Sequence, residues 1–78
     1  MIKLTQLEAV NTLIKAEKQK SENPWLRSGQ ALWNNIPNKY LQQYVANDYG
    51  YQREVDFFEE TDYDIVLNKF FKYFVEKV

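Results

Sequence analysis

Apolar residues recur every three or four positions along much of the chain, a spacing that predicts helices. The first helix begins after Thr5, which forms a capping box with Glu8: the Thr5 hydroxyl accepts from the Glu8 amide, and the Glu8 carboxylate accepts from the Thr5 amide. Asn23 and Pro24 suit the N-cap and first position of a second helix. Proline has no backbone N–H, and a helix start leaves the N–H at that position unpaired anyway. Helices are therefore predicted over about residues 6–20 and 24–35. The apolar side of the first consists of Leu7, Val10, Leu13 and Ile14.

Two more helices are predicted in the second half of the chain. Pro37 ends the second helix, since the residue before a proline avoids α geometry, and opens a third over about residues 38–47. A turn signal lies at 47–50, where Gly50 is a candidate for positive φ. Residues 48–61 are interpreted as a loop, although a short extended piece or a helical turn that pins two phenylalanines into the core fits Val55-Asp56-Phe57-Phe58 as well. Thr61 or Asp62 then caps a last helix over about residues 62–77.

The predicted fold class is all-α, a compact bundle of three to four short helices that forms a single domain of residues 1–78. Gly29 lies within the second helix, where glycine costs about 1 kcal/mol relative to alanine. We expect it where another helix backbone comes too close for a Cβ atom. The core is expected to contain Trp25, Leu32, Trp33, Leu67, Phe70 and Phe74.

The composition supports a small globular domain. Apolar residues make up 45% of the chain and aromatic residues 17%, enough for a rich core in 78 residues. There is no cysteine to form disulfides, no signal-peptide pattern at the start and no apolar run of about 20 residues that could span a bilayer. These features predict an intracellular, cytoplasmic protein.

The chain lacks the side chains that most catalytic mechanisms use. Without histidine or cysteine, the usual zinc ligands and the Ser-His and Cys-His triads are excluded, and two glycines do not make a phosphate-binding loop. A pair of carboxylates is the remaining option, and it needs a concave site that a domain this small seldom contains. A net charge of −1 and a pI near 5.3 also disfavour direct contact with nucleic acid. We therefore expect no enzyme activity, no cofactor, no metal, no direct nucleic-acid binding and no membrane association.

The charges are unevenly distributed. Residues 48–64 contain seven acids and only one base, Arg53, in a chain that is otherwise slightly basic. Acids before a helix are ordinary capping residues, and packing in the core or pinning of the loop is the favoured alternative for the tyrosines. Like charges this close repel, however, and a basic partner would relieve that repulsion. The hypothesis is a partner-binding surface made of Tyr49, Tyr51, Asp56, Glu59, Glu60, Asp62 and Asp64.

Two functions fit such a surface. The first is a non-enzymatic protein-interaction module that binds and modulates a protein complex. The alternative is an acidic decoy that mimics nucleic acid and occupies the nucleic-acid site of a partner protein. The identity of the partner and the oligomeric state of the chain do not follow from the sequence.

The stretch Leu26-Arg27-Ser28-Gly29-Gln30-Ala31-Leu32-Trp33-Asn34-Asn35-Ile36-Pro37 resembles a pattern found in small uncharacterised phage and prophage proteins. That pattern reads Arg-x-Gly-Gln-Ala-Leu-aromatic-Asn, then an apolar residue and often proline. Asp56-Phe57-Phe58 and the aromatic-rich end of the chain loosely match the downstream segments of those proteins. The resemblance carries no activity, and it implies a protein of a mobile element that acts on a host or phage macromolecule.

Overall fold

The computed structural model describes residues 1–77, which contain four helices and one small sheet. The elements in chain order are α1 (Gln6–Glu22), α2 (Ser28–Asn35), α3 (Asn38–Gln42), β1 (Val45–Asn47), β2 (Gly50–Tyr51) and α4 (Tyr63–Tyr73).

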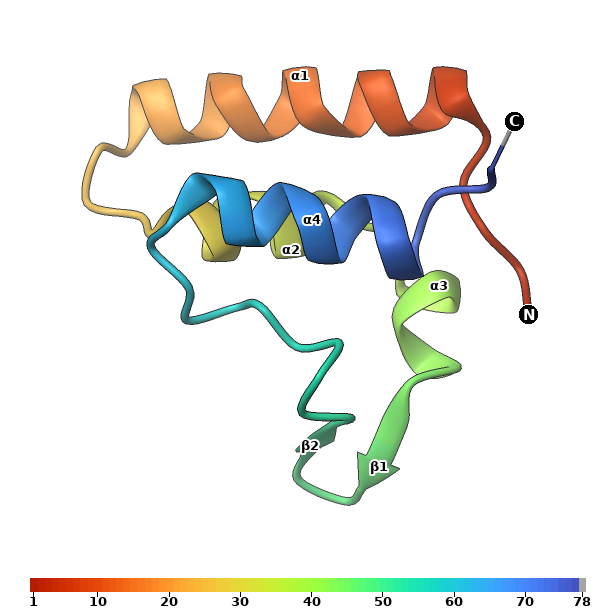
Figure 1. Cartoon of the computed structure of the whole chain (residues 1–78). Helices are drawn as coiled ribbons and strands as arrows, with labels where there is room; N and C mark the ends of the chain where they lie inside the picture. The colour runs from red at the N-terminus through yellow and green to blue at the C-terminus, as the bar shows by residue number, and fades with distance from the viewer. Residues whose placement is uncertain (78) are drawn as a thin grey trace.

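Three helices form the upper part of the molecule (Figure 1). α1 lies along the top, α2 and α4 lie beneath it, and α3 and the hairpin of β1 and β2 extend below. α4 runs back along α1 in the opposite direction. Two contacts fix this pairing: Tyr63 at the start of α4 donates to Glu17 near the end of α1, and Gln6 at the start of α1 donates to the Glu76 carbonyl.

The two ends of the chain are tied together by backbone pairing. Leu4 and Val75 form an isolated parallel bridge, in which the Leu4 amide donates to Phe74 O at 2.7 Å and the Glu76 amide donates to Leu4 O at 2.8 Å. Leu4 and Val75 are both buried. This bridge explains why α4 ends at Tyr73 and does not continue to residue 77 as the sequence predicted.

Trp33 is the centre of the core. Its indole makes edge-to-face contacts with the rings of Tyr51, Phe57 and Phe74, with ring centroids 5.1, 5.0 and 5.8 Å apart. Such aromatic pairs contribute about 0.5–1.5 kcal/mol beyond their buried area. Because the three partners come from β2, the loop after it and the end of α4, Trp33 connects α2 to the whole second half of the chain.

The prediction of an all-α bundle is wrong. Helices make up 53% of the chain, and β1 and β2 form an antiparallel hairpin with Val45 opposite Tyr51. The expected helix over 38–47 stops at Gln42, because Tyr44 turns inward and its hydroxyl donates to the Tyr73 carbonyl at 2.6 Å. The chain then pairs with residues 50–52 instead, and the Gln52 amide donates to Tyr44 O.

The predicted second helix begins four residues late. Asn23 ends α1 instead of starting α2: its amide and its side chain both donate to Gln19 O. Residues 23–27 therefore form a turn, and Trp25, predicted to be in the core, is 76% exposed. Leu67 is only half-buried, whereas Leu32, Trp33, Phe70 and Phe74 are buried as predicted.

α1 packs through small residues and exposes its largest ones. Ala9, Thr12 and Ala16 are buried, with Leu13 half-buried beside them. Leu7, at 70% exposed, and the other two members of the predicted apolar side, Val10 and Ile14, face solvent. The predicted capping box of Thr5 and Glu8 is present with both of its hydrogen bonds.

Gly29 is at a close backbone contact, but its neighbour is a loop and not a helix. Its amide donates to Glu60 O at 2.9 Å, and a Cβ atom there would lie 1.8 Å from Phe57 O. Gly50 has no positive φ, contrary to the prediction, and a Cβ there would meet nothing within 4 Å. The loop interpretation of residues 48–61 is correct for residues 52–60, which contain only turns and irregular backbone, and wrong for residues 50–51, which form β2. Phe57 is buried and Phe58 is half-buried.

Candidate protein-binding surface

Four of the seven predicted site residues line one shallow depression. Its volume is about 560 Å³, and it lies where β2, the loop of residues 52–60 and α4 meet. The predicted residues in it are Tyr51, Asp56, Glu59 and Glu60, and they are joined by Arg53, Phe57 and Lys69.

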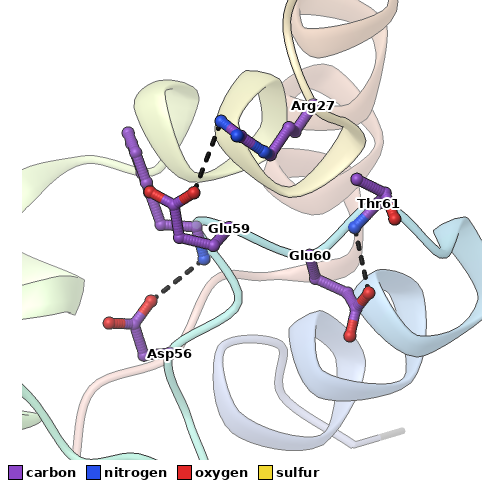
Figure 2. A network of polar contacts seen from close by, with 6 residues as sticks. Arg27, Asp56, Glu59, Glu60 and Thr61 are labelled. Carbon is purple, nitrogen blue, oxygen red and sulfur yellow. Dashed lines mark hydrogen bonds and ion pairs between the residues drawn. The ribbon is translucent and has the colours of Figure 1, made fainter.

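Glu60 and Asp62 fix the start of α4. The Glu60 carboxylate accepts from the Thr61 amide at 2.9 Å and from the Asp62 amide at 3.1 Å, and Figure 2 shows the first of these bonds. Asp62 is the N-cap of α4, and its carboxylate accepts from the Asp64 and Ile65 amides. Hydrogen bonds from backbone amides satisfy donors that a helix start leaves unpaired. These two carboxylates therefore have structural roles.

Asp56 and Glu59 are also held by neighbours (Figure 2). The Asp56 carboxylate accepts from the Phe58 amide at 3.0 Å, a local turn of the kind that aspartate favours. The Glu59 carboxylate lies 3.3 Å from the Arg27 guanidinium, with side chains 73% and 50% exposed. A pair this exposed contributes at most about 1 kcal/mol, so Glu59 remains accessible to a partner.

The two tyrosines differ in their surroundings. Tyr49 occupies the hairpin turn and is fully exposed, while its amide donates to the Asn47 side chain. Tyr51 is half-buried and packs its ring against Trp33. Both line a second depression of about 410 Å³ beside the hairpin, so Tyr51 connects the two hollows.

Asp62 and Asp64 line neither of these two depressions. Asp64 is exposed in the first turn of α4, where an acid interacts favourably with the helix dipole. The structure thus brings five predicted residues to adjoining hollows and places the other two on the neighbouring helix start.

Sequence reasoning missed the bases beside this surface. Arg27 comes from the turn before α2, and Lys69 reaches from α4 to donate to Asp56 O at 3.3 Å. Arg27 is more than 20 residues from the acids, and Lys69 lies on α4, whose direction of approach to Asp56 does not follow from local spacing. It also missed Trp25, the most exposed large aromatic after Tyr49, two residues before Arg27.

The described residues were compared with the features that metal binding and membrane insertion require. Within residues 1–77, no group of three or more acidic side chains is close enough to hold a metal ion. No helix of that range combines the length and the apolar character needed to cross a membrane. No family model, curated protein or solved structure matches this chain.

Proposed function

We propose that this chain is a non-enzymatic protein-interaction module that acts in the cytoplasm, on a phage or host protein complex, and binds its partner through the acidic and tyrosine-rich surface. The observation that carries the proposal is the pair of adjoining hollows joined by Tyr51, with the fully exposed Tyr49 at their edge. Tyrosine is enriched at protein interfaces, because it offers a large amphipathic ring at low cost in rotamer entropy.

The charge pattern favours a protein partner over mimicry of nucleic acid. A decoy needs carboxylates that point freely to solvent in place of phosphates. Here Asp56, Glu60 and Asp62 accept hydrogen bonds from backbone amides, and Arg27 and Lys69 lie among the acids. A surface of mixed charge and exposed aromatic rings is typical of a protein interface.

The experiment begins with capture of a partner on the immobilised chain from cells of its source. Association is then measured by surface plasmon resonance over a series of salt concentrations. Glu59→Lys and Tyr49→Ala probe the surface, since neither side chain is needed for packing. Glu60 is left unchanged, because a lysine there would face the Thr61 and Asp62 amides that the carboxylate now accepts from.

Glu22→Lys is the matched control for charge, because it makes the same change on an exposed residue at the end of α1. We expect Glu59→Lys to slow association about tenfold at low salt and to flatten its salt dependence, because rim charges act mainly on the association rate. Tyr49→Ala should speed dissociation. If both variants bind as the parent does, the interface lies elsewhere, and if short DNA or RNA competes with the chain for its partner, the decoy replaces the module.

A further inference from the structure

A cavity of about 150 Å³ lies between α1, α2 and the start of α4, and its lining includes no acid of residues 48–64. Its walls come from both helices and from the ring of Tyr63. The apolar lining consists of Leu13, Ala16, Ala31 and Leu32, and the polar lining consists of Glu17, Lys20, Ser28 and Tyr63.

Two alanines account for the space. Ala16 of α1 and Ala31 of α2 are 7% and 2% exposed, and both helices carry larger side chains at neighbouring positions. Each alanine contributes only a methyl group, so the side chains of α1 and α2 leave the space between Ala16 and Ala31 partly unfilled. The hollow is partly open to solvent, because Glu17 and Tyr63 of its lining are exposed.

The opening of the cavity has one donor and one acceptor, both on exposed side chains. The Tyr63 hydroxyl donates to Glu17 Oε1 at 3.2 Å. Partial burial, and secondly the neighbouring Glu17 carboxylate, raise the pKa of the Tyr63 hydroxyl above its usual range. Among residues 1–77 no other side chain donates to Glu17, so its second oxygen is free to accept.

The charges at the opening are balanced. Lys20 carries one positive charge, and its Nζ donates to Leu26 O at 2.7 Å, which holds it at the edge. Glu17 carries one negative charge on the same edge. A charged ligand would therefore gain one attraction and one repulsion at this edge, whereas an uncharged ligand meets neither.

We propose that this cavity binds a small uncharged aromatic molecule with one hydroxyl or N–H donor, its ring against Ala16 and Ala31 and its donor directed at the free oxygen of Glu17. The size is suitable, because an apolar protein cavity of roughly 150 Å³ holds one benzene ring. None of the residues that line this cavity belongs to the proposed protein-binding surface, although Tyr63 lies between Asp62 and Asp64 of that surface.

Phenol is the probe, and binding is followed by amide shifts in ¹H–¹⁵N NMR spectra of the whole chain. We expect saturable shifts at residues 16, 31 and 63, with phenol binding about tenfold more tightly than benzene, which lacks the donor. Ala16→Leu should weaken the binding of phenol at least about tenfold, because the larger side chain fills the cavity. Ala46→Leu, an exposed site on β1, is the matched control and should bind as the parent does.

Glu17→Ala gives a test that does not depend on repacking the core. It removes the acceptor and should reduce the preference for phenol over benzene to about twofold or less, while benzene itself still binds. The proposal is wrong if phenol shifts do not saturate, if they centre on the exposed rings of Trp25 and Tyr49, or if the preference survives in Glu17→Ala.

Discussion

Gly29→Ala is the substitution that best tests the described packing. A Cβ atom at this position would lie 1.8 Å from Phe57 O, 2.9 Å from Glu60 O and 3.0 Å from the Phe57 carbonyl carbon. All three are backbone atoms, so no side-chain rotation relieves the clash. The loop has to move by more than 1 Å, and it carries Phe57, which is 1% exposed and packs on Trp33.

The expected cost combines three terms. Alanine gains about 1 kcal/mol over glycine inside a helix. Displacement of the loop weakens the hydrogen bond from Gly29 N to Glu60 O, worth about 1 kcal/mol, and forcing a methyl group into packed backbone costs up to about 3 kcal/mol. The net loss is about 1–3 kcal/mol, out of a total of roughly 4–12 kcal/mol for a domain of this length.

Urea unfolding followed by tryptophan fluorescence measures this loss, because Trp33 is buried in the core. With a slope near 1 kcal/mol/M for a small domain, the midpoint should fall by about 1–3 M. Gly50→Ala is the control, since a Cβ there meets nothing within 4 Å, and it should change stability by less than about 0.5 kcal/mol. A Gly29→Ala midpoint equal to or above that of the parent would refute the contact, because helix propensity alone would then decide the outcome.

Three further outcomes are expected. Asp62→Ala should lower the free energy of unfolding by about 1 kcal/mol in a thermal melt, and Asp62→Asn should not, because asparagine keeps the capping oxygen. Tyr44→Phe should cost about 1–2 kcal/mol, since it leaves the carbonyl of a buried hydrogen bond without its donor. Burial raises the pKa of Tyr44, so the folded state keeps the proton of the Tyr44 hydroxyl to a higher pH than the unfolded chain does. Stability should therefore fall as the pH rises above about 10, and it should fall less steeply in Tyr44→Phe. Hydrogen bonds from the Thr5 amide, and secondly from the Thr5 side chain, lower the pKa of Glu8. The contribution of the ionised Glu8 to stability should therefore be complete above pH 4.5 and lost as the pH falls below it. Acid unfolding of Glu8→Gln should lack that part of the loss of stability.

Local signals determined where two helices begin. The capping box of Thr5 and Glu8 and the N-cap at Asp62 are present as predicted, because each is a contact between residues at most three positions apart. The burial of Phe70 and Phe74 also agreed with their spacing, since α4 has one dominant apolar side. The sequence shows that seven acids fall within residues 48–64, but it does not show that Asp56 and Glu60 accept hydrogen bonds from backbone amides.

Only the tertiary structure decided which apolar residues are buried and where the helices end. α1 buries alanines because α2 packs closely against it, which leaves the larger residues of its apolar side in solvent. The third helix gives way to a hairpin because Tyr44 bonds to the end of α4, and α4 itself stops because Leu4 pairs with Val75, 71 positions away in sequence. Periodicity and capping describe interactions within a few residues. The helix ends depend instead on hydrogen bonds between segments that are distant in sequence. The same reason explains why Gly29 could be recognised as a close contact from its sequence position, while the loop that approaches it could not.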